Sequence, residues 1–593
     1  NNLITVQNQA KEKDSRTIMY ITSSEKITSY TGCKDTFIGN STLENPEGIR
    51  KIELDRKNSL GKNEAIAIEI KVNLEAFERK DIVFLMGADV DFLSLQDTAY
   101  KYANVNNAIN EYESTIRYWK NILSNIKVET PMESMNILLN GWLLYQTLCS
   151  RMLARSGYYQ SGGAYGFRDQ LQDCIGLKYI SPEILKRQIL KHSRHQFVEG
   201  DVEHWWHEEN SRGIRTRFSD DLLWLPYMVA EYIKFTGDKS ILKEETNYIN
   251  GEILPEGVSE RYDLHPPSNQ KGSIYEHCIK AIEKSLVFGE NGLPKIGSGD
   301  WNDGFSNVGP KGKGESIWLG FFQYTVLDKF SKICEEVSEN IEEGDIALDK
   351  NHEATHKDIT AKTEKERAEK YRKIMEELRK HLNTNGWDGR WYKRAFMDDG
   401  NVLGSIQNEE CRIDSIAQSW ATISGAGDND KKYISLNSLE NHLVDKEAGI
   451  IKLLDPPFEK SKLEPGYIKA YIPGTRENGG QYTHGAIWAI IAEAMLGFGD
   501  KAVEYFRMIN PIEHARTKEE AKKYKVEPYV MAADIYGGEL AGRGGWTWYT
   551  GSSSWMYEAG IKYILGLRIE GRTLKIEQWI SKEWNEYSIK YKY

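Results

Sequence analysis

A long stretch of repeated apolar helices, from about Asn107 to about Ile564, constrains the fold more than any other feature. Apolar residues recur there at helical spacing, as in residues 132–145, 220–232 and 485–496. Glycine-rich segments separate these helices, so each one has to bury its apolar face against its neighbours. The repetition predicts the inner and outer helices of a toroid, although periodicity alone also permits another helical array.

Sequence typical of β-strands flanks the helical stretch on both sides. Before it, residues 52–54 alternate, residues 65–72 resemble a strand, and residues 81–87 predict a buried strand. After it, residues 567–576 predict a hairpin and residues 587–593 alternate. We therefore divide the chain into four parts: an N-terminal β region (1–106), a linker helix (107–131), a helical domain (132–564) and a C-terminal β segment (565–593).

Composition excludes several classes of protein. The chain has 593 residues, too many for one ordinary core, and no run approaches the ~20 apolar residues of a membrane span. A formal net charge of −11 argues against nucleic acid as the main partner. The six cysteines are scattered, which favours a reducing cytoplasm. The chain begins at Asn1 without a signal peptide and stops abruptly at Tyr593, so we expect a piece of a longer polypeptide.

One densely polar segment interrupts the apolar helices. Residues 335–381 are rich in Glu and Lys, and their second half, 362–381, predicts a solvent-exposed helix. We interpret the segment as a surface excursion without a catalytic role.

The glycine-rich run at 297–304 holds two carboxylates three residues apart, Asp300 and Asp303, around a Trp-Asn pair. A carboxylic acid beside an indole suits the protonation of a glycosidic oxygen, because an apolar neighbour keeps the acid protonated near neutral pH. The same residues also suit an Asx-rich turn that caps the next helix. Taken alone, the run leaves both interpretations open.

Four further segments carry a specific pattern: Gly-Phe-Arg-Asp-Gln-Leu-Gln-Asp at 166–173, Gly-Gly-Gln-Tyr-Thr-His-Gly at 479–485, Glu-Pro-Tyr at 527–529 continuing to 536, and Gly-Gly-Trp-Thr-Trp-Tyr-Thr-Gly-Ser at 544–552. With 297–304, they closely resemble the inverting β-glucoside phosphorylases of glycoside hydrolase family 94, in the same order, from about Tyr112 onward. Several ordered motifs are far more specific than one short pattern. The resemblance implies a mainly α fold, an (α/α)6 toroid barrel flanked by a partial N-terminal β-sandwich and a truncated C-terminal β domain.

The resemblance also implies which carboxylate does the chemistry. Inverting cleavage needs an acid at the leaving oxygen and a nucleophile on the opposite face of the sugar. Asp303 matches the family's catalytic acid, and Asp300 would then bond backbone amides within the turn. Trp301 would pack beside the bound sugar, the alternative being a core tryptophan.

A phosphorylase needs donors for phosphate rather than a base for water. Four positions match or suit phosphate ligands: Arg168, His484, Thr550 and Gly551. A nearby dianion favours the imidazolium form of His484, and a guanidinium can bind phosphate in a bidentate manner. The alternative for Arg168 is a salt-bridge cluster with Asp173. We expect the serines at 552–554 to cap a helix that begins near Trp555, whose N-terminus would also favour an anion.

Five positions are expected to contact substrate: Arg155, Asp169, Trp301, Glu527 and Tyr529. Asp169 would accept hydrogen bonds from the sugar in the −1 subsite, and Arg155 would join that subsite. Glu527 would contact or support the substrate, or act as the base in a hydrolase. The aromatic segment 204–208 is expected to line a sugar subsite or the core, because His204 and His207 have no third metal ligand.

The resemblance thus implies reversible phosphorolysis of a β-linked glucoside with inversion, giving α-glucose 1-phosphate, with inorganic phosphate as co-substrate and without metal or organic cofactor. Residues 299–304 and 311–319 are most similar to β-1,2-oligoglucan phosphorylases and the phosphorylase-like region of cyclic β-1,2-glucan synthases, which favours a β-1,2-glucooligosaccharide. Cellobiose, cellodextrin or chitobiose phosphorolysis stays open, as do a hydrolase and a non-catalytic glucan-binding domain. Family members often pair, so a homodimer is the expected oligomer.

Overall fold

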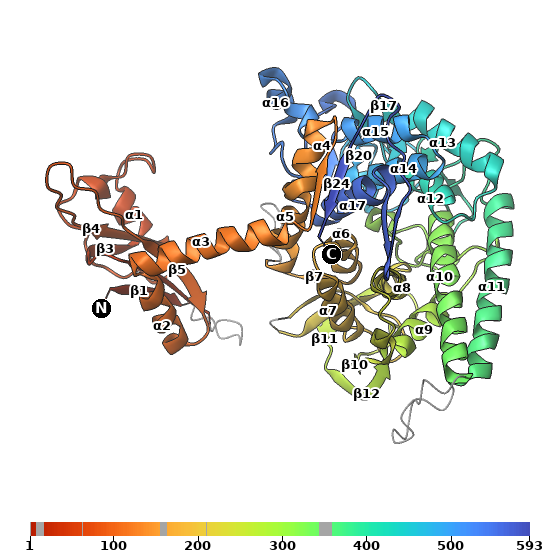
Figure 1. Ribbon diagram of the computed structural model, residues 1–593, viewed down its shortest axis with the longest axis horizontal. Helices are drawn as coiled ribbons and strands as arrows, with labels where there is room; N and C mark the ends of the chain where they lie inside the picture. Colours follow the sequence, from red (N-terminus) through yellow and green to blue (C-terminus); the bar gives the residue numbers. More distant parts are fainter. Residues whose placement is uncertain are drawn as a thin grey trace. The chain divides into compact units, whose positions relative to one another are not determined.

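The computed structural model describes residues 2–7, 17–61, 63–154, 163–208, 210–342 and 359–592. The chain forms two compact units, Asn1–Ile122 and Leu123–Tyr593. Figure 1 labels the elements of both units along the sequence.

The first unit contains two small antiparallel sheets. One has the order β1 (Leu3–Gln7), β2 (Ile18–Ser23), β5 (Phe84–Asp89), and the other pairs β3 (Ile27–Cys33) with β4 (Glu64–Ile70). The helices are α1 (Lys34–Ile38), α2 (Phe92–Tyr102) and α3 (Val105–Ile122). A small core joins Tyr20 of β2 to Leu95 and Ala99 of α2.

Two strand predictions in this unit were wrong. Residues 52–54 form no strand. The strand predicted at 81–87 exists as β5, but it is not buried: Phe84 is 57% exposed and Met86 73%. Alternate side chains of a strand point to opposite faces, and α2 covers only the face that holds Tyr20 and Leu85. The apolar sequence therefore indicated a strand but not its environment.

In the second unit, six helices form a closed ring within the described residues. They are α6 (Phe167–Leu177), α8 (Trp224–Thr236), α10 (Ile317–Glu342), α12 (Ser415–Ile423), α14 (Thr483–Met495) and α17 (Thr550–Glu558). Each contacts the next, and α17 contacts α6. These inner helices are buried almost all round; in α14 every residue from Thr483 to Ala494 is buried. Such burial explains why their sequences are apolar on a broad face.

An outer helix packs beside each inner one. The first is a helical run made of α4 (Glu133–Ile137), a π-helical turn (Leu138–Trp142), α5 (Leu143–Thr147) and a second π-helical turn (Leu148–Met152). The others are α7 (Pro182–Ser193), α9 (Ile274–Ser285), α11 (Ala361–Thr384), α13 (Asn429–Leu443) and α15 (Gly499–Met508). Contacts pair α5 with α17, α7 with α6, α9 with α8, α11 with α10, α13 with α12 and α15 with α14. The predicted (α/α)6 toroid is confirmed.

The polar helix predicted at 362–381 is α11, and it is not simply exposed. It lies alongside α10 (Figure 1). Its Tyr371, Leu378 and Leu382 are buried, and their spacing places them on one face of the helix. A narrow apolar stripe therefore sufficed to make it an outer helix of the toroid.

Short β-sheets form in the segments between the helices and at the C-terminal end of this unit. A four-stranded sheet has the order β11 (Glu260–Leu264), β9 (Arg212–Thr216), β8 (Glu203–His207), β7 (Tyr165–Gly166). Short antiparallel pairs join β10 (Glu245–Ile249) to β12 (Pro267–Ser273), β13 (Glu315–Ser316) to β14 (Ala395–Phe396) and on to β15 (Val402–Leu403), β16 (Ile413–Asp414) to β19 (Leu454–Asp455), β17 (Val444–Asp445) to β18 (Ile450–Ile451), and β20 (Gln481–Tyr482) to β21 (Asp534–Ile535).

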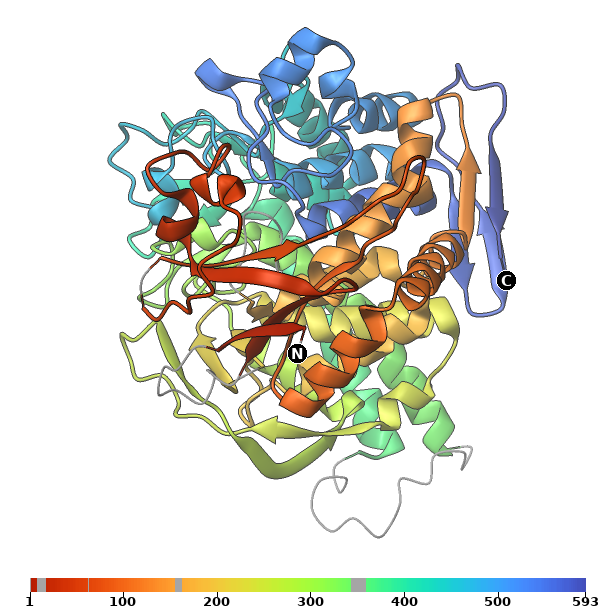
Figure 2. The same cartoon turned by 90° about the vertical axis from the view of Figure 1, so that its left-hand side faces the viewer.

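The predicted C-terminal hairpin is β22 (Leu567–Glu570) with β23 (Thr573–Ile576). The last predicted strand is β24 (Ser588–Tyr591), which pairs with β6 (Ile126–Glu129), as Figure 2 shows. None of the helices in the described ranges has the length and apolar character that crossing a membrane requires.

Candidate active site

A polar cavity of about 290 Å³ lies where the N-terminal ends of α6, α14 and α17 meet. All three are inner helices of at least nine residues, so the positive ends of their dipoles face the cavity. Six of the predicted site residues line it: Arg168, Asp169, Trp301, Asp303, His484 and Gly551. Segments more than 300 residues apart in sequence therefore meet at one site.

The two carboxylates of the 297–304 run have different surroundings. Asp300 is fully buried; it accepts hydrogen bonds from both Nη atoms of Arg394 at 2.7 Å and from the Ser316 hydroxyl at 2.7 Å. It also accepts one from the backbone N–H of Asn302 at 3.0 Å. The Asp303 side chain is 38% exposed and lines the cavity. Asp300 therefore holds the turn, and Asp303 is the carboxylate that a ligand can reach.

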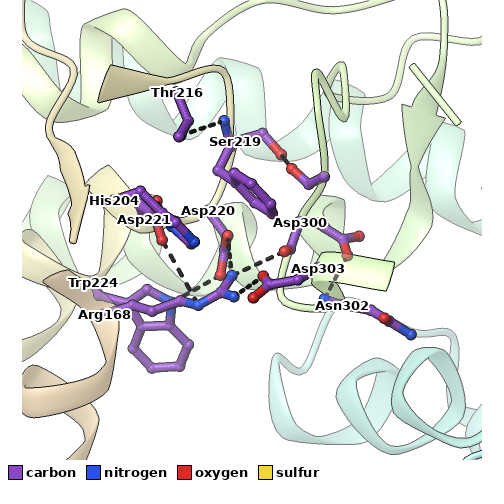
Figure 3. A network of polar contacts seen from close by, with 12 residues as sticks. Arg168, His204, Thr216, Ser219, Asp220, Asp221, Trp224, Asp300, Asn302 and Asp303 are labelled. Atoms are coloured by element: carbon purple, nitrogen blue, oxygen red, sulfur yellow. Dashed lines mark hydrogen bonds and ion pairs between the residues drawn. The ribbon is translucent and has the colours of Figure 1, made fainter. Parts of the chain in front are cut away.

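Arg168 lies at the centre of a carboxylate cluster (Figure 3). Its Nη1 donates to Asp220 and to the backbone carbonyl of Asp300, both at 2.9 Å, and its Nη2 donates to Asp303. Its Nε lies 3.7 Å from Asp221. The structure thus places Arg168 in a salt-bridge cluster, but with these three aspartates and not with Asp173. The guanidinium positions the loop that carries Asp303.

His204 brings a second positive charge to this cluster. Its Nδ1 lies 2.7 Å from the Asp221 carboxylate, and its ring stacks on Phe218. Burial alone would lower the pKa of His204, but Asp221 outweighs it and raises the pKa to about 9. His204 and its neighbour Trp205 both line the cavity, whereas Trp206 is buried in the core.

His484 and Gly551 line the same cavity as Asp303 but come from the C-terminal part of the sequence. Burial, reinforced by the charge of Arg168, lowers the pKa of His484 to about 3, so its imidazole is neutral without a ligand. Its Nε2 is buried and has no hydrogen-bond partner in the described part of the chain. A Cβ at position 551 would lie 3.3 Å from two atoms of the ring, so glycine is what allows this close approach.

The helix that follows these motifs begins earlier than predicted. Tyr549 has extended backbone angles, and α17 starts at Thr550 rather than near Trp555. The Gly551 amide is therefore in the first turn, where backbone N–H groups have no intrahelical acceptor. Ser553 lies within the helix, and its hydroxyl donates to the Thr550 carbonyl. The serines are thus not caps, and Gly551 lies in the first turn of α17 among the residues that line the cavity.

Thr550 connects the motif to two residues that sequence reasoning did not assign to the site. Its hydroxyl donates to Asp173 at 3.0 Å and accepts from Arg151 Nε at 3.1 Å. Burial raises the pKa of Asp173 to about 7 despite the opposing charge of Arg151. Glu477, two residues before the glycines of the 479–485 motif, also lines the cavity, and burial raises its pKa to about 7. Asp173 ends the 166–173 motif and Glu477 precedes the 479–485 motif, which was the available signal; Arg151 lies outside every motif.

Three described residues of the predicted site are not among those that line the cavity: Thr550, Glu527 and Tyr529. Glu527 lies outside it, with one carboxylate oxygen buried and unpartnered among the described residues. Tyr529 packs on Trp142, with ring centroids 4.5 Å apart. Arg155 lies outside the described residues. Trp301 is buried, and its ring contacts His484 at 5.2 Å between centroids, so it links the acid's turn to the His484 side of the cavity.

The site thus combines carboxylates, cationic donors and aromatic rings at the ends of inner helices of an (α/α)6 toroid. The family model described as "Glycosyl hydrolase 94 superfamily, catalytic domain" matches residues 118–358 and 347–566. That described as "Glycosyl hydrolase 94, supersandwich domain" matches residues 1–114. The chain therefore belongs to glycosyl hydrolase family 94.

Individual relatives give the same placement. The chain is 40% identical over 573 residues to the cyclic beta-(1,2)-glucan synthase NdvB of Rhizobium meliloti, a match that covers 96% of this chain and 19% of that protein. It is 26% identical to the solabiose phosphorylase of Paenibacillus borealis, covering 99% of this chain and 70% of the relative. A bacterial glucoamylase complexed with acarbose shares the fold, with a TM-score of 0.55 at 11% identity, over 93% of this chain and 72% of that one. The chain thus spans about a fifth of the synthase.

Proposed function

We propose that this chain catalyses reversible, inverting phosphorolysis of a β-linked glucoside, with a β-1,2-glucooligosaccharide as favoured substrate and α-glucose 1-phosphate as product. One observation carries the proposal: a single cavity holds the accessible carboxyl of Asp303 and, at the N-termini of two helices, Gly551 and the His484 ring, whose Nε2 has no partner among the described residues. The first suits a leaving oxygen and the second suits an anion. The 40% identity to a cyclic β-1,2-glucan synthase supports the choice of linkage.

In this proposal Asp303 donates its proton to the glycosidic oxygen as the C1–O bond breaks. A phosphate oxygen attacks C1 from the opposite face, so the electron pair of the broken bond stays on the leaving oxygen and the configuration inverts. Phosphate is held by Arg168, His484, Thr550 and Gly551. Arg168 shares its Nη2 between Asp303 and phosphate, because one N–H of that nitrogen donates to Asp303.

Other groups hold the sugar. Asp169 accepts hydrogen bonds from hydroxyls in the −1 subsite, and Trp301 covers one face of the ring. Phosphate is the co-substrate, and we propose that neither metal nor organic cofactor takes part. Glu527, the base of a hydrolytic alternative, does not line the cavity.

A second candidate is a glucan-binding domain within a larger synthase, which the 19% coverage of NdvB favours. The test for both is sugar 1-phosphate production from β-1,2-glucooligosaccharides, cellobiose and chitobiose, with and without phosphate. Phosphate-dependent α-glucose 1-phosphate that is lost in Asp303→Asn would establish the reaction and its linkage. Reducing sugar released equally without phosphate would refute phosphorolysis. Binding without turnover, unaffected by Asp303→Asn, would favour the binding domain.

A further inference from the structure

Arg151 reaches the cavity from an unusual stretch of helix. It lies in the π-helical turn Leu148–Met152, at the end of the helical run that begins at Glu133. Such turns are rare and recur at functional sites, because the extra residue re-aims a side chain. The preceding segment α5 packs on α17. This packing brings the Arg151 side chain to the first turn of α17, where its Nε lies 3.1 Å from the Thr550 hydroxyl.

The donors of Arg151 are mostly unused. Among the residues that the structure describes, only its Nε has partners: Thr550 and, at 3.4 Å, the Asp173 carboxylate. The side chain is 16% exposed and lines the cavity. A guanidinium has five N–H donors in a planar fork, and leaving them unpaired in a mostly buried place is costly. The two Nη groups are thus available to a ligand.

Arg168 lines the same cavity, but its guanidinium is already paired with carboxylates. Each of its nitrogens lies within 4 Å of a carboxylate, from Asp220, Asp221 or Asp303. Bidentate binding of an anion through both Nη groups would therefore require it to give up one of its present contacts, because both N–H groups of Nη1 already donate. Arg151 needs to give up none, because its fork is free.

The surroundings of Arg151 also suit an anion. It adjoins Thr550 and the amide-bearing turn that contains Gly551. Its nearest carboxylate, Asp173, is fully buried, and one oxygen of Asp173 has no hydrogen-bond partner within the described ranges; the charge of Asp169 also acts on Arg151. Burial raises the pKa of Asp173 to about 7, so near neutral pH that group does not fully neutralise Arg151.

We infer that Arg151 is a further oxyanion-binding residue, whose free guanidinium edge binds phosphate in the pocket formed with Thr550, Gly551 and His484. The inference rests on the proposed function, because it names phosphate as the ligand. It deepens that function by adding a residue whose donors are ready before phosphate arrives. Bidentate binding of a phosphate oxygen pair is what a planar guanidinium fork provides.

The test is phosphate binding by isothermal titration calorimetry, together with initial rates at varied phosphate and saturating glucan. The variants are Arg151→Gln, Arg151→Lys and the double variant Arg151→Gln/Asp173→Asn. Arg516→Gln serves as control, because Arg516 is an exposed arginine paired with Glu513 and does not line the cavity. Thermal midpoints of all variants establish that they are folded.

Arg151→Gln should weaken phosphate binding and raise the KM for phosphate roughly 10- to 100-fold, as expected for the loss of charge-assisted hydrogen bonds. The KM for glucan should change less than about twofold, since a phosphate ligand acts on one substrate. Arg151→Lys should be intermediate, and Arg516→Gln should match the wild type. The double variant should remain as weak as Arg151→Gln, because neutralising Asp173 does not replace the lost donors.

Two results would overturn the inference while the proposed function stands. One is an unchanged phosphate affinity in Arg151→Gln. The other is recovery in the double variant, which would mean that Arg151 only neutralises Asp173. A wild type that binds phosphate but does not catalyse phosphorolysis would refute the proposed function alone. The phosphate affinities of the variants would still test whether Arg151 binds phosphate. A wild type without phosphate binding would overturn both.

Discussion

Replacement of Asp300 and of Asp303 by asparagine should separate structure from catalysis within one short turn. Asp300→Asn removes the charge that Arg394 contacts through both Nη atoms. Arg394 is fully buried and, among the described residues, would keep the Ser316 hydroxyl at 3.2 Å and one carboxylate, Asp414, 3.4 Å from its Nε. Breaking a buried ion pair from one side costs about 3–5 kcal/mol, because the remaining charge is left uncompensated.

The expected shift in Tm follows from the size of the unit. An unfolding entropy of roughly 2.1 cal/mol/K per residue over the second unit, Leu123–Tyr593, gives about 1 kcal/mol/K. Asp300→Asn should therefore lower Tm by about 3–5 °C. Asp303 is partly exposed, and Arg168 keeps Asp220 and Asp221 when Asp303 is changed. Asp303→Asn should therefore lower Tm by about 1 °C at most.

The two substitutions should affect activity in the reverse order, with Asp303→Asn the more damaging. Loss of a general acid typically costs about 10²–10⁴-fold, so Asp303→Asn should lose nearly all phosphorolysis while staying folded. Asp300→Asn should keep measurable activity below its own Tm. Differential scanning calorimetry and α-glucose 1-phosphate release on the same preparations provide both readouts. A stable, inactive Asp300→Asn beside an active Asp303→Asn would refute the assignment.

The pH dependence provides a control on the energetic argument. Burial tends to raise the pKa of Asp300, but Arg394 outweighs it and holds the pKa below its usual value. A carboxylate with a lowered native pKa stabilises the fold above its unfolded pKa, and that contribution is lost as pH falls through the native value. The stability difference between wild type and Asp300→Asn should therefore shrink in acid. A difference that stays constant from pH 7 to pH 3 would contradict the ion-pair explanation.

Three other changes have defined outcomes. Gly551→Ala places a Cβ 3.3 Å from the His484 ring and should raise the phosphate KM about tenfold at nearly constant Tm; an unchanged KM would exclude this contact. Burial raises the pKa of Glu493 to about 7, so Glu493→Gln should stabilise the protein by ~3 kcal/mol at pH 9. The same substitution should hardly change stability at pH 4, where the unfolded and native carboxyls are both largely protonated. Equal effects at both pH values in denaturant unfolding would refute this. Asp221 raises the pKa of His204 to about 9, so His204→Gln should destabilise by up to ~3 kcal/mol below pH 6.5 and by much less above pH 9; a loss that grows at high pH would contradict the pairing.

The sequence predicted the helices of the toroid well, because helical periodicity is a local property. Apolar residues spaced along 220–232 and 485–496 correspond to α8 and α14. The sequence misjudged conformation at residues 52–54, which form no strand, and more often it misjudged the environment of a correctly predicted element. Residues 81–87 indicated a strand but not that Phe84 and Met86 face away from α2. The polar composition of 362–381 concealed buried apolar side chains, among them Tyr371, Met375 and Leu378, on the helix α11, which packs against α10.

The sequence by itself also determined the candidate chemistry, since motif order identified Asp303, His484 and Gly551 before their positions were known. The tertiary structure alone decided which groups complete the site. Arg151 meets Thr550 across 399 residues, and Arg168 meets Asp303 across 135. These contacts depend on closure of the helical ring, which local patterns do not encode. Protonation states likewise depend on burial and neighbouring charge, so the neutral His484 and the charged His204 could be distinguished only in the folded chain.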